Sequence, residues 1–438
     1  ADRNRSHWST SKTPSYTKSV SWQHHRILKF HSEIKNSIKN AKKFKGILFV
    51  NIISYLLLTI AIRKGHSKEI LKFKWLILLF GGSVAKYFVA RASFLNGDYI
   101  FAKKLYQEII KVNPIHTDSY YGLADVYRLT GNKLEAKDVL IQVFNFSDRL
   151  KTWLLLANLV DTKKDYDELL NHWERECSYR NILKYHYDVN DYLIIAALRA
   201  KLYEEALNRV KVLLGSINSE AFILPKTSNK NFSVNAAKIA LLGLKKILDA
   251  NKIQFFLVSG TLLGCIRDKK LLKHDKDIDI GVWSETNLSV LSTKIACSGL
   301  FDIAPMRSPY TLRIKHVNGV AIDIFFHYRD HDSYWHAGSK LRWNNTPFNL
   351  ISYGFLGNVF LIPENYDLYL TENYGNWMQE KMKFDSAFDT PNHEIVNMYE
   401  LKIHAYKKLI INMKIGSVEG VRYYEDKLNE LGCIISKP

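Results

Sequence analysis

Three aspartates in alternating positions are the residues of this chain best placed to do chemistry. Asp275, Asp277 and Asp279 occupy every second position of the segment HDKDIDIGV. On a β-strand, side chains two positions apart share one face, so Asp277 and Asp279 point away from Ile278 and Ile280. Neighbouring carboxylates repel each other, and a divalent cation that prefers oxygen ligands, such as Mg2+, would remove the repulsion. The spacing therefore predicts a metal site on a strand.

A third acid lies in a second apolar segment, Val320 to Phe326, which also reads as a strand. Asp323 is in its middle, and an ionised carboxylate is almost never left unpaired inside a protein. A metal shared with Asp277 and Asp279 would give it a partner. We therefore predict that Asp277, Asp279 and Asp323 are the catalytic and metal-binding residues, with Mg2+ as the cofactor and Mn2+ as an alternative.

The segment before these acids predicts a strand, a tight turn and a short helix. Phe255 to Val258 is apolar, Ser259 and Gly260 break the run, and Thr261 to Arg267 can begin a helix. Free amides and the helix dipole favour an anion at such a start. Arg267, at the end of the helix, is a candidate charge clamp. The residues predicted to bind substrate are Ser259, Gly260, Thr261, Gly264, Arg267, Asp275, Arg313 and Lys315.

Arg313 and Lys315 belong to an alternating strand, Thr311 to Val317, and share one face of it. Asn318-Gly319 then predicts a two-residue hairpin turn, and the returning strand carries Asp323. Two roles stay open for the basic pair: contact with a phosphate, or simple solvation.

Histidines and acids cluster after this hairpin. The spacing of His327, His331 and His336 matches no standard set of zinc ligands. A surface loop is therefore expected here rather than a metal site.

The motifs together resemble the signature of the LicD/fukutin family. The matching residues are SGTLLGCIR at 259–267, HDKDIDIG at 274–281 and IDIF at 322–325. The segment Ile362 to Trp377 is similar to the family's C-terminal motif, and the resemblance covers about 235–392. Lys276 departs from the pattern, because many members carry another Asp there. The resemblance implies a polymerase-β-type nucleotidyltransferase fold.

By the same resemblance, the expected activity is Mg-dependent transfer of a phospho-alcohol or phospho-sugar from a CDP-linked donor. Phosphocholine, ribitol phosphate and glycerol phosphate are the types of group expected. The acceptor would be a hydroxyl of an anionic cell-surface glycan, such as capsule, teichoic acid or lipopolysaccharide, and not nucleic acid. Asp323 would also help to take the proton from that hydroxyl. Two alternatives stay open: strict transfer of NMP from an NTP onto a small molecule or RNA, and a non-catalytic repeat scaffold.

Helical repeats of the tetratricopeptide type precede this region. Small Ala102 and Ala136 are 34 residues apart, the period of that repeat, and Ala206 recurs after about two further periods. Degenerate repeat units are expected before and after the two clearest units, with the helices of the earliest at Gly46–Ile62 and Lys68–Phe80. Such arrays offer surfaces to partners. A protein partner, self-association and a purely supporting role all stay open.

The predicted domains are a basic tail at 1–45, tetratricopeptide-like repeats at 46–224 and the catalytic domain at 225–438. The polar segment Pro225 to Phe232 marks the boundary between the last two. The fold class expected is α+β, in which an all-α solenoid is followed by an α/β domain.

Charge and composition point to an anionic partner. The net charge is +19 and the pI is near 9.4, which suits a phosphate-bearing substrate or an acidic membrane surface. Four scattered cysteines fit a reducing compartment. Gly46 to Ile62 has no charge but is slightly short for a membrane span, which needs about 20 residues. Peripheral contact at the inner membrane of a bacterium is expected, with an integral span or a Golgi membrane as alternatives.

Overall fold

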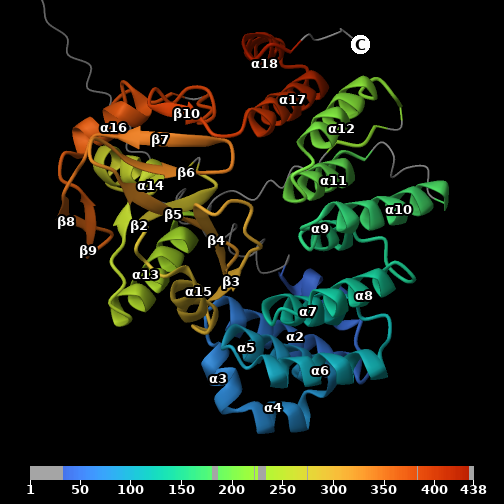
Figure 1. Ribbon diagram of the computed structural model, residues 1–438. Coiled ribbons are helices and arrows are strands. Elements are labelled where there is room, and N and C mark those ends of the chain that lie inside the picture. Colours follow the sequence, from blue (N-terminus) through green and yellow to red (C-terminus); the bar gives the residue numbers. More distant parts are fainter. Residues whose placement is uncertain are drawn as a thin grey trace, which may run out of the picture.

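The computed structural model describes residues 33–179, 186–220, 222–224, 233–273, 275–381 and 383–433. It consists of an all-helical N-terminal part and a mixed-sheet part that follows it in the chain (Figure 1). This arrangement confirms the predicted α+β class. Residues 1–32, most of the predicted basic tail, lie outside the described residues.

The N-terminal part, called here the helical array, is a series of helices that pack on their neighbours in the chain. Its helices are α2 (Leu48–Arg63), α3 (Ser67–Lys72), α4 (Lys74–Phe80), α5 (Gly82–Leu95), α6 (Tyr99–Val112), α7 (Thr117–Leu129), α8 (Lys133–Val143), α9 (Lys151–Ala157), α10 (Lys163–Tyr179), α11 (Tyr187–Arg199) and α12 (Tyr203–Gly215). The helix expected at Lys68–Phe80 is divided at Phe73 into α3 and α4.

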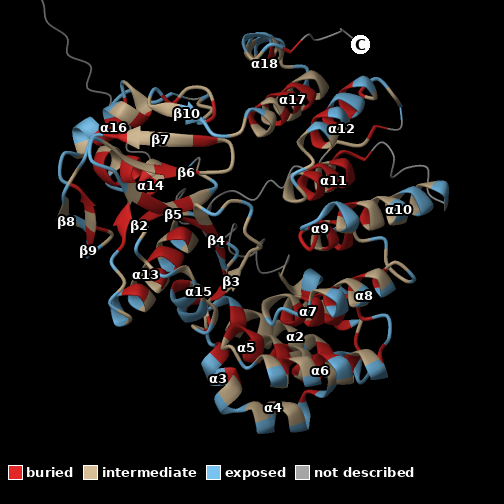
Figure 2. Cartoon of the chain, in the orientation of Figure 1, coloured by how far each residue is buried: buried red, intermediate tan, exposed pale blue. Residues whose placement is uncertain are grey.

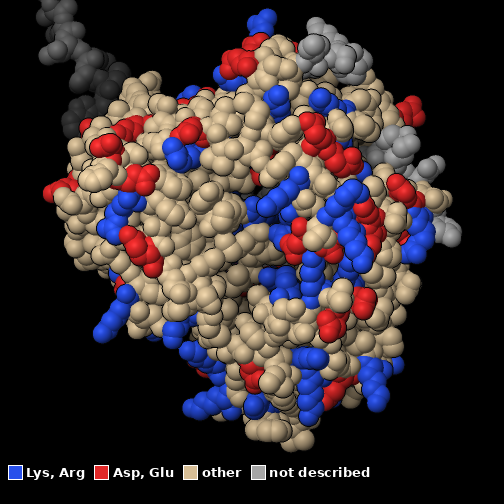
Figure 3. Space-filling view, in the orientation of Figure 1, with Lys and Arg blue, Asp and Glu red and all other residues tan. Residues whose placement is uncertain are grey.

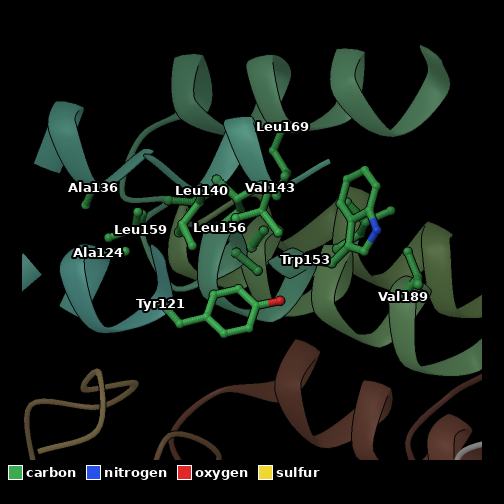
Figure 4. Close-up of a cluster of buried hydrophobic side chains, with 14 of the residues drawn as sticks. Tyr121, Ala124, Ala136, Leu140, Val143, Trp153, Leu156, Leu159, Leu169 and Val189 are labelled. Carbon is green, nitrogen blue, oxygen red and sulfur yellow. The ribbon is translucent and has the colours of Figure 1, made fainter. Parts of the chain in front are cut away.

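The small residues that revealed the repeat spacing lie where the helices meet. Ala102, Ala136 and Ala206 have no exposed surface, and neither does Ala90 of α5. A larger side chain at these points would push the helices apart, because interiors are close-packed. Between the small residues, large apolar side chains such as Trp153 fill the core (Figure 4).

The first helices of the array leave apolar side chains in solvent. None of the residues of α4 is buried, although the helix reads KWLILLF. Across the described ranges, no helix combines the length and the apolar character that a membrane span requires.

The sheet contains ten strands, and its longest strands lie at the centre of a buried core (Figure 2). The strand order is β10-β7-β6-β5-β2-β1-β9-β8, with β4 joining β5 to β3. The pairs β2–β5 and β1–β9 are parallel and the others antiparallel. The strands are β1 (Phe256–Leu257), β2 (Asp277–Trp283), β3 (Phe301–Ile303), β4 (Thr311–His316), β5 (Ala321–Arg329), β6 (Tyr334–Ala337), β7 (Leu341–Asn345), β8 (Leu350–Phe355), β9 (Asn358–Pro363) and β10 (His393–Ile395).

Several helices support this sheet. The long helix α13 (Val234–Ala250) begins at Ser233, whose side chain accepts a hydrogen bond from the Ala236 amide, as the Ser cap in the sequence predicts. The others are α14 (Ser259–Leu263), the π-helical turn η2 (Gly264–Asp268), α15 (Leu288–Ala296) and α16 (Tyr366–Tyr374).

The last two helices, α17 (Met398–Ile415) and α18 (Val418–Glu430), belong to a different core. Their buried side chains, among them Tyr406, Leu409 and Leu428, join the hydrophobic cluster of the helical array. Helix α17 packs directly on α12. The array therefore takes in two helices from the far end of the chain.

The array also touches the mixed-sheet part of the chain, called here the sheet domain, near Gly299. Its amide donates to the Leu95 carbonyl over 2.8 Å, and its carbonyl accepts from the Ser67 hydroxyl over 2.9 Å. A Cβ at Gly299 would lie 2.4 Å from the Ser67 Oγ, and its φ is +85°. Glycine is required where two backbones approach this closely.

Candidate active site

The three predicted catalytic aspartates lie together on the central strands of the sheet. Asp277 and Asp279 are on β2, Asp323 is on the parallel neighbour β5, and Asp279 is in register with Asp323. Ile278 and Ile280 between the acids are fully buried on the opposite face. Strand alternation therefore places all three carboxylates on one face, called here the carboxylate edge.

These carboxylates are close enough to affect each other's ionisation. Burial, followed by the charges of Asp277, Asp275 and Asp323, raises the pKa of Asp279 well above its usual range. Burial, followed by the charge of Asp323, raises the pKa of Asp277. Burial and the charge of Asp277 raise the pKa of Asp275 to about 6. The edge thus holds more negative charge than its surroundings neutralise.

Arg313 supplies one counter-charge to this edge. Its Nε donates to Asp323 Oδ1 over 2.6 Å, and its Nη2 donates to Asp323 Oδ2. The same Nη2 lies 3.8 Å from Asp277 Oδ2. Arg313 on β4 is in register with Asp323 on β5, so the hairpin itself aligns the pair.

The turn that the sequence predicted to hold a phosphate uses its polar groups to support the carboxylate edge. The Gly260 amide donates to the Asp279 carboxylate, and the Thr261 hydroxyl accepts from the Asp279 amide over 2.9 Å. A Cβ at Gly260 would lie 2.5 Å from Asp275 Oδ2. Ser259 begins α14 with φ +48°. The turn fixes the position of Asp279, and phosphate binding by these residues stays a prediction.

Gly264 and Arg267 lie on the next turn of helix. A Cβ at Gly264 would lie 2.6 Å from the Lys270 carbonyl oxygen, so this glycine lets the chain cross closely. Arg267 donates to the Asp268 carboxylate over 2.9 Å and to the Trp377 carbonyl over 3.3 Å.

A large cleft passes along the carboxylate edge and separates the sheet domain from the helical array. Its volume is about 1860 Å³, and both parts of the chain line it. Figure 3 shows Lys and Arg side chains gathered in the middle of the view, between the sheet domain and the array. The predicted site residues that line the cleft are Ser259, Gly260, Arg267, Asp275, Asp277, Asp279, Arg313, Lys315 and Asp323. Thr261 and Gly264 lie behind its wall.

Sequence reasoning missed the cleft residues that lie outside the motifs. Lys340 is half-buried, and burial lowers its pKa. Lys151 comes from α9 of the array and lies 4.7 Å from the centre of the Tyr121 ring. Arg307 follows β3 in a loop. No local pattern marks these residues, because only the packing of the two domains brings them to the cleft.

The surface loop predicted around the histidines is wrong for two of them. His327 on β5 and His336 on β6 are buried and stack with ring centres 4.4 Å apart. Burial lowers the pKa of His327 to about 3 and that of His336 well below its usual range. Only His331 lies exposed in the connecting loop. Because histidine is polar, the sequence did not indicate that β5 continues through a buried His327.

The donor chemistry of the carboxylate edge fits a hard divalent cation. Carboxylate oxygens are the ligands that Mg2+ and Mn2+ take in proteins, and a cation would offset the repulsion that raises the pKa values of Asp277 and Asp279. Among the described residues, no three acidic, histidine or cysteine side chains converge closely enough to form a ready-made metal site. In this arrangement Arg313 holds both oxygens of Asp323.

Comparison with known proteins agrees with this geometry. Residues 252–365 match the nucleotidyltransferase domain of LicD/FKTN/FKRP. The chain is also similar to the ribitol-5-phosphate transferase FKTN of Macaca fascicularis, at 24% identity over 43% of this chain and 41% of that protein. The human protein of the same name is 25% identical over 36% of each chain. The chain thus spans about two fifths of these curated relatives, and its residues 252–365 resemble a LicD/FKTN/FKRP nucleotidyltransferase domain.

Proposed function

We propose that this protein transfers a phospho-alcohol or phospho-sugar from a CDP-linked donor to a hydroxyl of a cell-surface glycan. The observation that carries the proposal is the carboxylate edge: Asp277, Asp279 and Asp323 on neighbouring parallel strands, open to a large cleft. The match of residues 252–365 to the LicD/FKTN/FKRP domain supports it. The similar proteins are named ribitol-5-phosphate transferases, which makes ribitol phosphate the first group to test.

The donor diphosphate lies against the carboxylate edge in this proposal. Asp277 and Asp279, with Asp323, would hold Mg2+ or Mn2+ there, and the bound cation would neutralise charge on the transferred phosphoryl group. Arg267 and Arg313 both line the cleft beside the edge and supply positive charge for phosphate oxygens. Ser259 and Gly260 form the adjoining wall. Catalysis in such sites is mostly positioning and electrostatic stabilisation.

In the reaction, the acceptor hydroxyl attacks the phosphorus next to the alcohol. A new P–O bond forms to the acceptor, the bond from that phosphorus to CMP breaks, and CMP leaves with the bridging oxygen. The hydroxyl proton passes to a carboxylate of the edge. The bidentate contact with Arg313 occupies both carboxylate oxygens of Asp323. Asp277, which has no such contact, is the better placed of the two to accept the proton.

The acceptor enters through the same cleft, so the helical array forms the opposite wall of its binding site. Lys151 and Tyr121 of the array and Lys340 of the sheet domain all line this space. Positive side chains on both walls suit an anionic glycan, in keeping with the net charge of +19.

The protein works at a membrane surface, and the first helices of the array provide the contact. On α4, Trp75, Leu76, Leu79 and Phe80 are all more than half exposed. Their spacing of i, i+1, i+4 and i+5 places them on one side of the helix. An aromatic and aliphatic face of this kind suits the boundary between lipid headgroups and acyl chains.

Positive charge surrounds this apolar face. Lys68, Lys72 and Lys74 are in α3 and at the start of α4. In Figure 3, uncharged side chains form the lowest tip of the molecule, where Figure 1 places α4, with Lys and Arg side chains nearby. Lysines beside an exposed apolar face favour anionic lipids. We therefore assign this surface to an anionic bilayer.

The deciding experiment measures which product each donor releases. The full chain is incubated with Mg2+ and CDP-ribitol, CDP-glycerol or CDP-choline, together with a glycan acceptor, and CMP is quantified. Release of CMP with a phosphodiester formed on the glycan supports the proposal. Pyrophosphate release from an NTP, with no CMP from any of the three donors, would replace it with strict nucleotidyl transfer. The Asp277→Asn variant serves as the control for background hydrolysis.

A further inference from the structure

The inner face of the helical array holds one segment of the sheet domain at three points. Arg91 of α5 pairs with Asp302 over 2.5 Å, and its guanidinium lies 5.4 Å from the centre of the Phe94 ring. Arg128 of α7 donates to the Ile303 carbonyl over 2.9 Å. These two contacts come from the first helices of consecutive helix pairs.

The third contact comes from α11, further along the array. Arg199 donates to the Met306 carbonyl over 2.7 Å. Its own position is fixed by the Val160 carbonyl at 2.8 Å and by Asp161 at 2.6 Å. The three arginines therefore hold residues 302–306, the end of β3 and the start of the loop that leads to β4.

The next residue after this segment is Arg307, which lines the cleft and is exposed to it. Within the described part of the chain, no hydrogen bond or ion pair holds its guanidinium. Partial removal of the guanidinium from water lowers its pKa, and the like charges of Arg313 and Arg199 lower it further. The charges of Asp191 and Glu400 act in the opposite direction. Lys407 already pairs with Asp191. A guanidinium in such a place lacks an anion, and its planar donors match a phosphate or a carboxylate.

Arg307 stands apart from the carboxylate edge. The charged groups that act on it most strongly are Asp191 and Arg199 of α11, Arg313 of β4 and Glu400 of α17. Arg313 in turn is bound to Asp323. Asp191, Arg199 and Glu400 belong to helices α11 and α17 of the array, and the cleft extends along the array, so we take an anion on Arg307 to be a different group from the donor diphosphate at the edge.

We propose that Arg307 binds an anionic group of the acceptor, a phosphate or a carboxylate, and that the helical array positions Arg307 through the arginines that hold residues 302–306. This inference rests on the proposed transfer reaction for the identity of the acceptor. The inference gives the helical array an indirect role in substrate binding, because its inner face holds residues 302–306 of the sheet domain, next to Arg307. Arg307 is a binding residue, and Arg128 and Arg199 are positioning residues.

The first test separates binding of the acceptor from binding of the donor. With a CDP donor that is turned over, Arg307→Gln should raise KM for the anionic acceptor by roughly 10- to 100-fold, because a hydrogen bond between charged partners is lost. KM for the donor and kcat should stay within about threefold of wild type, and Arg307→Lys should recover part of the loss. An unchanged KM for the acceptor, or an equal rise in KM for the donor, would overturn the inference.

The second test asks whether the array acts through Arg307. Arg199→Gln should raise the same KM, and the double variant Arg199→Gln/Arg307→Gln should be no worse than Arg307→Gln alone. Arg209→Gln is the matched control, because Arg209 contacts Glu205 and Tyr166 within the array. Additive effects of Arg199 and Arg307, or an equal effect of Arg209, would rule out positioning through the segment.

A third measurement does not depend on activity. Inorganic tripolyphosphate is titrated calorimetrically into the full chain in EDTA, which removes metal complexes from the carboxylate edge. Wild type and Arg209→Gln should bind it, and Arg307→Gln should bind about tenfold or more weakly. Equal binding by wild type and Arg307→Gln would refute the assignment. If no CDP donor is turned over, the proposed reaction fails, and this titration still decides the role of Arg307.

Discussion

Arg313 on β4 holds both carboxylate oxygens of Asp323 on β5, directly across one antiparallel register pair. The contact joins the hairpin to the carboxylate edge, because β5 is also the parallel partner of β2. A flexible lysine could supply the same charge but not the two parallel hydrogen bonds. The pair therefore determines how Asp323 is oriented.

We expect Arg313→Lys to lower kcat by roughly 10- to 100-fold, the usual cost of losing a residue that orients a metal-binding carboxylate. The variant should also bind Mn2+ differently from wild type, since Asp323 is free to turn. Steady-state kinetics and Mn2+ titration by electron paramagnetic resonance measure the two effects. Unchanged kcat and Mn2+ affinity would show that the pair has no part in the site.

The crowded charge on the carboxylate edge predicts opposite effects of Asp279→Asn on activity and stability. Activity should fall by roughly 100- to 1,000-fold, as when a major electrostatic group is removed from an active site. The melting temperature of the metal-free protein should rise, because a neutral Asn removes the cost of burying a charged carboxylate and its repulsion with Asp277, Asp275 and Asp323. Thermal melts in EDTA and in Mg2+ provide the measurement. A lower melting temperature in EDTA would contradict this account of the edge.

The buried His327 predicts a loss of stability in acid. Burial lowers the pKa of His327 from 6.5 to about 3, so the unfolded chain binds a proton that the folded chain does not. The stability of the folded protein should therefore fall as the pH drops below about 6.5, by an upper limit of about 4 kcal/mol near pH 3. His327→Phe removes the titrating group and the buried Nε2, which has no hydrogen-bond partner in the described chain.

Melting curves from pH 8 to pH 4.5 measure this effect. The difference in melting temperature between His327→Phe and wild type should grow as the pH falls. His331→Gln, in the exposed loop four residues away, is the control and should follow wild type. A constant difference at every pH would mean that His327 does not titrate with folding.

Two glycines predict a contrast in packing. Gly264→Ala places a methyl group 2.6 Å from the backbone carbonyl of Lys270, which has little freedom to move. We expect a loss of about 1–3 kcal/mol in unfolding free energy, the usual cost of overpacking. Gly354→Ala on β8 meets open space and should cost little. Urea unfolding of both variants compares them directly, and equal losses would refute the close crossing at Gly264.

The apolar face of α4 predicts binding to anionic vesicles. The full chain should float with vesicles of phosphatidylglycerol and phosphatidylcholine, and less with phosphatidylcholine alone, since lysines flank the face. Trp75→Ser/Leu79→Ser should reduce the bound fraction several-fold. Val418→Ser, which removes an even more exposed apolar side chain from α18, should not. Flotation that is independent of lipid charge, or unaffected at α4, would exclude this surface.

Much of the sheet domain could be predicted because its signals are local. The alternation of Asp and Ile gave the face of β2, and Asn318-Gly319 gave the hairpin that brings Arg313 to Asp323. The Ser233 cap gave the start of α13. In each case neighbouring residues alone determine the backbone.

The cleft could not be predicted, because it depends on contacts between distant segments. Nothing near Arg307 in the sequence indicates that Arg128 and Arg199 reach the preceding residues. Thr261 shows the same limit: its hydroxyl suits a phosphate by type, but the fold turns it toward the Asp279 amide. The polar character of His327 likewise concealed its burial in the sheet.

The return of α17 and α18 to the core of the helical array makes the sheet domain an insertion rather than a tail. The chain leaves the array after α12 and comes back to it at α17, so the sheet domain is tethered at both of its ends. A domain attached by a single linker can swing freely, whereas one attached at two places has its orientation restricted. Opening of the cleft would then be a small flexing about two fixed anchor points, and any larger separation would require α17 to detach from α12.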